Sequence, residues 1–220
     1  TGDGNQVSPI KAGCDINLEP AWELCAGDPS IIVAVVDQPV IYTHPDLKAN
    51  MWINEKELNG EEGVDDDGNG YVDDIYGFNF ISEYSATTGE SKYIGEIQWD
   101  DDSNAKVHGT HVAGTISAVN NNGVGVCGVA GGTGNNDGVK LMSIQIHGPM
   151  SSATTEGTAA GIKYAADNGA SILQCSWGEP NGRPGTEEEY LEKFGVQADA
   201  INYFISKPRP GSPLNGGIAI

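Results

Sequence analysis

Two histidines, His108 and His111, lie three residues apart at the start of a segment that is typical of a helix. Three small residues follow the first histidine, namely Gly109, Ala113 and Gly114, and they would let such a helix pack closely against a sheet. An imidazole held at the rim of a cleft can act as a general base near neutral pH. His108 is therefore a candidate base, which needs a carboxylate to orient its ring and a group whose proton it removes.

Asp37 is the candidate for that carboxylate. It follows the unbroken apolar run at 31–36, Ile-Ile-Val-Ala-Val-Val, which is typical of a strand buried on both faces of a parallel sheet. In open α/β sheets, sites form at the carboxyl ends of the strands, where Asp37 stands. An aspartate that only stabilises a turn is the alternative, and position alone favours neither.

The elements that must position these two residues alternate along the chain. Strands are expected at 31–36, 139–146, 170–176 and 216–220, and helices at 18–24, from the histidine segment at 107–115, at 154–168 and at 187–206. This order predicts an α/β fold with three layers, a mostly parallel sheet with helices on both faces. We expect a single domain over 1–220, with an N-terminal arm at 1–17. The chain stops as the last strand begins, so the domain is expected to be truncated, incomplete at its C-terminus.

An acidic stretch at 63–74 has the ligand spacing of a calcium loop. Oxygen donors stand at alternate positions, and Gly70 allows a sharp bend. Tyr76 occupies the position where a complete helix-loop-helix calcium site has a bidentate glutamate, so a complete site of that kind is excluded. A solvated acidic turn is the alternative, and the acidic run at 100–102 could add a ligand or simply be exposed. The predicted ligands are Asp65, Asp67, Asn69, the Tyr71 carbonyl and Asp73.

Composition narrows the class of partner. The chain has 31 acidic and 11 basic residues and a net charge of -20, which argues against nucleic acid or an anionic membrane surface because phosphates would be repelled. No apolar run is long enough to span a membrane. Among the four cysteines, Cys14 and Cys25 could pair in an oxidising compartment, whereas Cys127 and Cys175 stand in apolar runs and are expected to be buried free thiols.

Four blocks, taken in order, resemble the subtilisin-like serine proteases. They are the strand that ends at Asp37, the segment Tyr-Thr-His-Pro-Asp-Leu at 42–47, the segment His-Gly-Thr-His-Val-Ala-Gly-Thr at 108–115, and Ser-Trp-Gly at 176–178. The segment Asn-Gly-Tyr-Val-Asp-Asp at 69–74 also resembles a block of many bacterial subtilases. The resemblance extends from about residue 18 to residue 220, and the histidine block is its most specific part.

The resemblance implies a role for each of these blocks. Asp37 would be the aspartate of an Asp-His-Ser triad and His108 its general base. Ser176, Trp177 and Gly178 would form one edge of a cleft that pairs with an extended peptide or protein substrate, and Gly148 and Ser151 would lie on its other side. His111 would pack structurally one turn along the helix. The family further implies a secreted or cell-envelope serine endopeptidase.

Three departures from the family pattern stand out. Gln38-Pro39 replaces the usual Ser or Thr followed by Gly, and Val107 replaces a Gly. Neither the block with the oxyanion asparagine nor the block with the nucleophilic serine occurs within the 220 residues. We therefore expect a parent protein that is a protease and a chain that does not hydrolyse peptides alone, because loss of one triad member removes most of the catalysis.

Two other functions remain open at this stage. A non-catalytic peptide-binding module could use the same cleft, and the Gln38-Pro39 departure favours that alternative. A metal-dependent hydrolase could use His108, His111 and the acidic runs. Its histidines are three apart with no Glu between them, unlike the zinc protease motif, which spaces them four apart.

Overall fold

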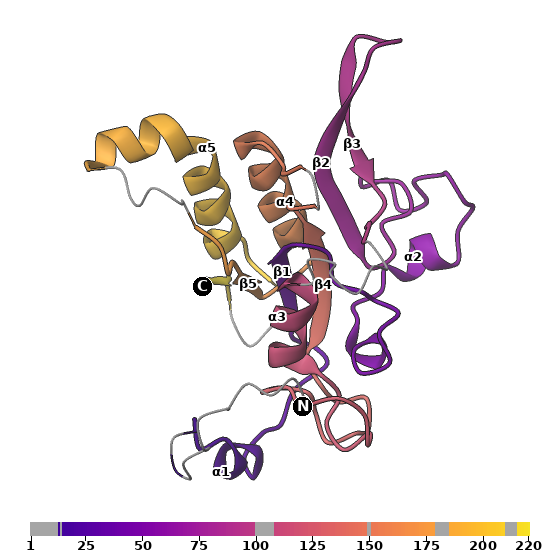
Figure 1. The fold of residues 1–220 in the computed structure, drawn as a ribbon, viewed down its shortest axis with the longest axis vertical. Coiled ribbons are helices and arrows are strands. Elements are labelled where there is room, and N and C mark those ends of the chain that lie inside the picture. The colour runs from indigo at the N-terminus through magenta and orange to yellow at the C-terminus, as the bar shows by residue number, and fades with distance from the viewer. Residues whose placement is uncertain (1–12, 14, 100–107, 149–150, 179–184, 210–214) are drawn as a thin grey trace, which may run out of the picture.

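The computed structural model describes residues 13, 15–99, 108–148, 151–178, 185–209 and 215–220. Its strands are β1 (Ile32–Asp37), β2 (Gly77–Ser85), β3 (Glu90–Gly95), β4 (Lys140–Gln145), β5 (Ile172–Gln174) and β6 (Ile218–Ala219). They form one sheet in the order β3-β2-β4-β1-β5-β6 (Figure 1), and every pair except β2–β3 is parallel. The mostly parallel sheet predicted from the sequence is confirmed.

The helices are α1 (Glu19–Trp22), α2 (Glu55–Leu58), α3 (His108–Ser117), α4 (Thr155–Asp167) and α5 (Glu187–Ser206), with a short 3-10 helix η1 (Lys48–Asn50). The longest of them, α5, begins with a capping box in which the Thr186 side chain accepts from the Glu189 backbone and the Glu189 side chain reaches back. Thr154 caps α4 in the same position. Both helices therefore begin where the sequence predicts.

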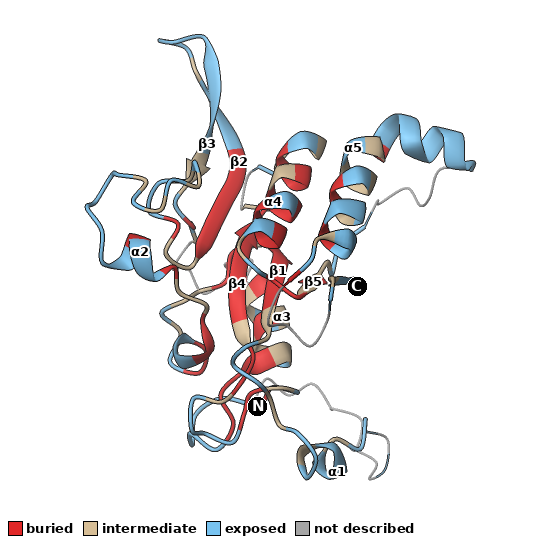
Figure 2. Ribbon diagram, turned by 180° about the vertical axis from the view of Figure 1, so that it is seen from behind, coloured by how far each residue is buried: buried red, intermediate tan, exposed pale blue. Residues whose placement is uncertain are grey.

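Helices cover both faces of the sheet, so the structure has the three predicted layers. Alternate residues of β1 face opposite sides, as strand geometry requires. Ala34 and Val36 belong to the apolar cluster that includes α4 and Phe204 of α5. Val35 belongs to a second cluster that includes Ala113 of α3. Figure 2 shows the buried residues concentrated in the central strands and on the inner sides of these helices.

Strands β2 and β3 were not predicted from the sequence. The first five residues of β2 are buried and the rest are largely exposed, so the strand has neither a continuous apolar pattern nor a clean alternation. Asn79 interrupts its apolar part, and its amide is satisfied there by the Glu96 carbonyl and the Ile81 backbone N–H. The two strands form a hairpin that projects beyond the body of the sheet (Figure 1).

The cysteine prediction was wrong for Cys127, which is exposed because it lies in a surface loop after α3. Cys25 is also exposed, and its proposed partner Cys14 lies outside the described residues. Cys175 is partly buried, as its apolar surroundings predict. Within the described residues, no helix is long and apolar enough to cross a membrane.

Candidate active site

Asp37 and His108 come together at the carboxyl edge of the sheet. Asp37 ends β1 and is almost completely buried, and His108 begins α3 with about half of its side chain exposed. The imidazole Nδ1 lies 2.8 Å from Asp37 Oδ1 and 3.0 Å from Oδ2. A carboxylate only accepts, so Nδ1 carries the proton and Nε2 is left with its lone pair. The arrangement is an imidazole oriented as a base.

The start of α3 is held against the turn that follows Asp37. Gln38 Oε1 accepts the backbone N–H of His108 at 3.0 Å, and the Gln38 N–H donates to Asp37 Oδ1 at 2.6 Å. Thr110 Oγ1 donates to the Pro39 carbonyl and accepts the N–H of Ile41. The unusual Gln38-Pro39 turn therefore supports the carboxylate and the base, which removes the argument that it favoured a non-catalytic module.

Trp177 lies beside the end of β1, on the side of β1 that pairs with β5. Its indole N–H donates to the Val36 carbonyl at 2.7 Å, so the ring covers the end of β1. Ser176 and Gly178 beside it are exposed, and Ser176 Oγ accepts from Gln174. The structure thus places this segment at the sheet edge that carries Asp37.

His147 is a residue of this edge that the sequence analysis did not single out. Its backbone N–H donates to the Asp37 carbonyl at 3.3 Å, and its ring meets Trp177 edge-on with centroids 6.2 Å apart. Its Nδ1 lies 2.9 Å from Ser152 Oγ. Burial lowers the pKa of His147, which favours the neutral ring. His147 directly follows the apolar run at 139–146, which contains β4. A histidine at the end of a predicted parallel strand was the signal in the sequence that could have revealed it.

The segment after β4 carries Gly148 and Ser151. The Gly148 N–H donates to the Ser151 carbonyl at 2.8 Å, and residues 147 and 152 form an antiparallel bridge. Residues 149–150 lie outside the described residues. Gly148 and Ser151 therefore stand at the same edge as His147, on the opposite side of β1 from the segment at 176–178.

Cys175 is the thiol nearest to this edge. Burial, and then the negative charge of Asp37, raise its pKa to about 12. The thiolate is the nucleophilic form of cysteine, so this thiol is inert at neutral pH. Among the described residues, His108 Nδ1 is hydrogen-bonded to Asp37, and no serine hydroxyl is hydrogen-bonded to the ring.

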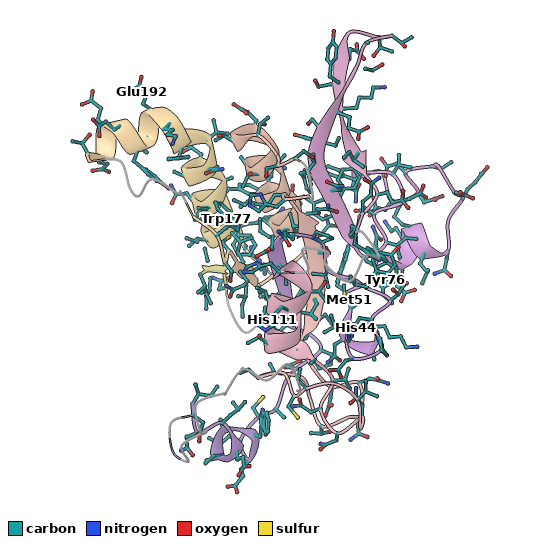
Figure 3. All side chains as sticks on the ribbon, viewed as in Figure 1. His44, Met51, Tyr76, His111, Trp177 and Glu192 are labelled. Carbon is teal, nitrogen blue, oxygen red and sulfur yellow. The ribbon has the colours of Figure 1, made fainter. Side chains whose placement is uncertain are left out.

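Figure 3 labels the other two histidines of the resembling blocks, His44 in the loop after β1 and His111 on α3. His44 Nδ1 accepts the Asp46 N–H within its own turn. His111 is exposed on α3, so the expectation that it packs against its surroundings was wrong. The zinc alternative finds no support in the residues described, whose one group of candidate metal ligands does not include either α3 histidine.

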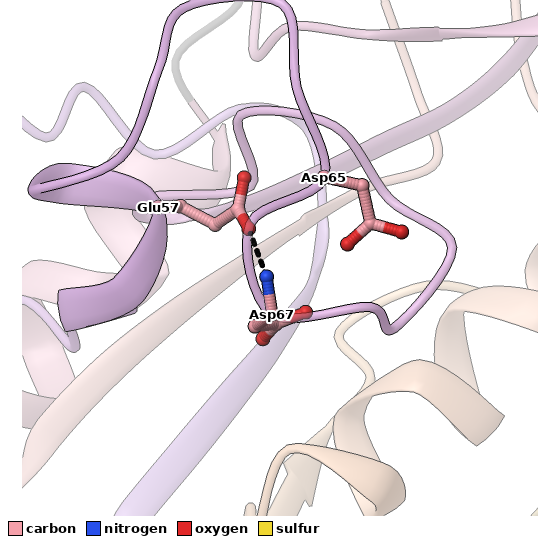
Figure 4. A group of neighbouring side chains, drawn as sticks. All are labelled: Glu57, Asp65 and Asp67. Atoms are coloured by element: carbon pink, nitrogen blue, oxygen red, sulfur yellow. Dashed lines mark hydrogen bonds between the residues drawn. The ribbon is translucent and has the colours of Figure 1, made fainter.

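Among the described residues, that group lies in the acidic loop. Glu57, Asp65 and Asp67 each offer an oxygen within 4.8 Å of the others' (Figure 4). Glu57 comes from α2 and is buried, so the spacing in the loop could not reveal it. Its carboxylate accepts the backbone N–H groups of Asp66 and Asp67 at 2.8 and 3.0 Å and of Asp73 at 2.9 Å.

The remaining predicted ligands have other contacts as well. Asn69 Oδ1 accepts the Tyr71 N–H, Asp73 Oδ2 accepts the Gly63 N–H, and the Tyr71 ring packs against Phe78 and Phe80. The residues at 100–102 lie outside the described part of the chain.

The acidic loop is tied to the core through a buried carboxylate. Asp74 accepts from Tyr164 Oη at 2.6 Å and from the amides of Asn69 and Asn54, each at 2.9 Å. Burial raises the pKa of Asp74, while these three hydrogen bonds oppose that rise. Asn54 also donates to Asp67, so the candidate metal ligands are linked to α4 through two side chains.

A carboxylate-oriented imidazole at the carboxyl edge of a mostly parallel sheet is placed where it could act as a general base. A comparison with protein families identifies the family. The family model described as the subtilase family matches residues 28–207, and the chain belongs to this family.

Individual relatives agree with that assignment. Over 97 residues, 44% of this chain, it is 47% identical to subtilisin-like protease 1 of Plasmodium berghei. It is 30% identical over 175 residues to halolysin of Haloferax mediterranei, and 32% identical over 191 residues to the minor extracellular protease Vpr of Bacillus subtilis. These matches cover 80% and 85% of this chain. The matches span 14%, 25% and 19% of the three relatives, respectively.

A solved structure shows the same fold. A protease of Pseudoalteromonas arctica matches 93% of this chain and 52% of its own, with a TM-score of 0.57 and 23% sequence identity. The homology supports a protease function, and proteases of this family act on peptides or proteins.

Proposed function

We propose that the protein to which this chain belongs is a secreted or cell-envelope serine endopeptidase, in which Asp37 and His108 are two members of an Asp-His-Ser triad. The observation that carries this proposal is the pair of contacts at 2.8 and 3.0 Å between His108 Nδ1 and a buried carboxylate. The names of the extracellular relatives support the location.

The proton movements we propose follow the Asp-His-Ser mechanism. Asp37 holds the tautomer in which Nε2 of His108 can accept a proton from a serine hydroxyl as that oxygen attacks the peptide carbonyl. The buried carboxylate then stabilises the imidazolium that forms. His108 returns the proton to the leaving amine. In this proposal the serine and the oxyanion donor would come from residues outside this sequence, so the 220 residues by themselves are expected to be inactive.

The substrate would lie along the edge that carries these residues. The exposed backbone at Ser176 and Gly178 is suited to pair with an extended peptide. Gly148 and Ser151 would bound the peptide on the opposite side. Between these walls, Trp177 and His147 present an aromatic and a polar surface next to the base.

Calcium is the metal that fits the acidic loop. Glu57, Asp65 and Asp67 supply hard oxygen donors, and Asn69, Asp73 and the Tyr71 carbonyl are the further ligands we propose. A bound calcium ion would neutralise the clustered carboxylates. These residues are not part of the Asp37–His108 site. Their proposed role is therefore to stabilise the loop and, through Asp74, its attachment to α4.

The protease proposal is tested on the protein expressed with its sequence continuing beyond Ile220. We expect hydrolysis of fluorescent casein that falls about 10⁴-fold in Asp37→Asn and about 10⁶-fold in His108→Ala. His111→Ala is the matched control, because it removes an exposed imidazole one turn away. Absence of hydrolysis by the unaltered protein, together with retained peptide binding, would establish the binding module instead.

The calcium proposal is tested by thermal unfolding with calcium and with a chelator. Ligand that binds the native state must raise the melting temperature. We expect a rise in the unaltered protein and a much smaller one in Asp65→Asn, with Glu187→Gln as a control for charge. Equal melting temperatures with and without calcium would reject the site.

A further inference from the structure

A concave surface lies between β3 and the acidic loop, and neither Asp37 nor His108 lines it. Its volume is about 1220 Å³, and its lining consists of residues 92–97, residues 57, 58, 60 and 62, residues 69–73 and 75–78, and Tyr42. We call it the β3 groove. Typical small-molecule pockets measure about 300–1,000 Å³, so this groove is large enough for a segment of a polypeptide.

Exposed apolar side chains form part of its walls. Leu58 is 44% exposed, Val72 is 43% exposed and Tyr93 is 39% exposed, and all three line the groove. These residues come from α2, the acidic loop and β3, which are distant in sequence. Their convergence on one concavity gives a contact surface that a peptide could cover.

The polar groups of the β3 groove are mainly acidic. Glu62 and Glu96 are exposed carboxylates on its lining that are not among the proposed calcium ligands, and Lys92 is the one cationic residue among the described residues that line it. Burial, and then the negative charge of Glu96, raise the pKa of Tyr42, so this groove tyrosine stays a neutral donor beside that carboxylate. Tyrosine faces and carboxylates together attract ammonium and guanidinium groups.

The backbone of β3 offers a second mode of contact. In the described part of the chain, β3 is an end strand that pairs only with β2, and its residues 90–93 are exposed. Both ribbon views place β3 between β2 and the loop that carries α2, so its free edge faces the groove (Figures 1 and 2). A free strand edge is a template for an added strand.

We propose that the β3 groove binds an extended, lysine- or arginine-bearing segment of another protein, which pairs with the free edge of β3. Charge complementarity selects this occupant, because the lining is acidic and the chain carries a net charge of -20. An acidic segment would be repelled. Binding does not require peptide hydrolysis, and so this site is independent of the catalytic pair.

The test uses a fluorescein-labelled ten-residue peptide in which lysine alternates with valine, since alternation places all lysines on one side of a strand. Its counterpart has glutamate at every lysine. Fluorescence anisotropy at low salt should show saturable binding of the lysine peptide and none of the glutamate peptide. Affinity should fall about tenfold when salt screens the charges.

Variants locate the binding. Glu62→Gln combined with Glu96→Gln should weaken binding about tenfold, and Tyr93→Ala about fivefold. Glu187→Gln combined with Glu192→Gln removes the same charge from the exposed surface of α5 and should leave affinity unchanged. Circular dichroism confirms that each variant is folded.

Hydrogen exchange supplies a readout that net charge alone would not move. The lysine peptide should slow exchange of amides within 90–95, where a strand is added. Protection at 147–152 or 176–178 instead would place the peptide in the catalytic cleft and overturn the proposal. Equal affinity of both peptides, or equal loss in the α5 control, would also overturn it.

Discussion

The close approach of Gly109 to the turn after Asp37 predicts how a substitution at position 109 would change the Asp37–His108 contact. A Cβ at position 109 would lie 1.9 Å from the Gln38 carbonyl oxygen, 2.7 Å from the Gln38 carbonyl carbon and 3.1 Å from the Pro39 oxygen. These are backbone atoms, which cannot rotate away as a side chain can. Restoring an ordinary contact of 3.4 Å requires a separation of about 1.5 Å between α3 and this turn.

The Gly109→Ala substitution should therefore separate the base from its carboxylate. His108 precedes Gly109 and Asp37 precedes Gln38, so the same displacement lengthens the 2.8 Å bond beyond hydrogen-bonding distance. Overpacking costs about 1–3 kcal/mol, and a lost hydrogen bond to a charged group about 1.5–3 kcal/mol. The two terms are not additive, and we expect a loss of about 3 kcal/mol in the free energy of unfolding.

Gly114 provides the matched control within the same helix. Nothing lies within 4 Å of a Cβ at that position, so Gly114→Ala should stabilise by about 0.5–1 kcal/mol through helix propensity. Urea unfolding should shift the midpoint down by about 1 M in Gly109→Ala and slightly up in Gly114→Ala. Proton NMR should show the hydrogen-bonded Nδ1–H of His108 in the control and not in Gly109→Ala. Identical midpoints and identical Nδ1–H signals in the two variants would refute the steric reasoning.

Three further predictions concern pH and packing. Burial lowers the pKa of His147, so the unfolded state binds its proton more readily, and stability should fall as pH drops below about 6.5; His147→Gln should make urea midpoints less sensitive to pH in that range. Burial by itself would raise the pKa of Asp167, but hydrogen bonds from Lys163, Lys207 and Tyr203 lower it to about 2. The contribution of the Asp167 carboxylate to the free energy of unfolding is therefore complete above pH 3.8 and is lost as pH falls toward 2. At pH 7, Asp167→Asn should lower the free energy of unfolding by under about 1 kcal/mol, because these ion pairs are partly exposed and screened. Urea titration at pH 7 and near pH 2 measures both effects. Phe80→Ala should cost about 3–5 kcal/mol by urea unfolding, because the ring is fully buried in the cluster between the sheet and α4; a loss under 1 kcal/mol would contradict that packing.

The sequence predicted the central layers of the fold because their signals are local. The unbroken apolar run before Asp37 and the one at 139–146 became β1 and β4, and the capped segments became α4 and α5. These patterns depend on neighbours within a few residues. Strand β2 was missed because Asn79 interrupts its apolar run. The contacts that satisfy this side-chain amide come from the Ile81 N–H within β2 and from the Glu96 carbonyl.

In the acidic loop, too, some features follow from local sequence and others depend on tertiary contacts. The spacing of the loop's oxygen donors predicted Asp65 and Asp67 as candidate ligands, and these two carboxylates lie close together in the structure. Glu57 belongs to a different element, and only the folded chain brings its carboxylate within 4.8 Å of the other two. A ligand that arrives from outside a loop leaves no trace in the spacing of that loop.

The sequence by itself determined the types of residue that can transfer a proton, the strand that ends in Asp37 and the helix that begins with His108. Only the tertiary structure decided that they meet, because they are 71 positions apart in the chain and their 2.8 Å contact depends on the registers of β1 and α3. Gln38 and Gly109 fix that contact, one by accepting the His108 N–H and the other by having no side chain. Both residues matter because two segments that are distant in the sequence approach closely, and a local sequence pattern contains no information about such an approach.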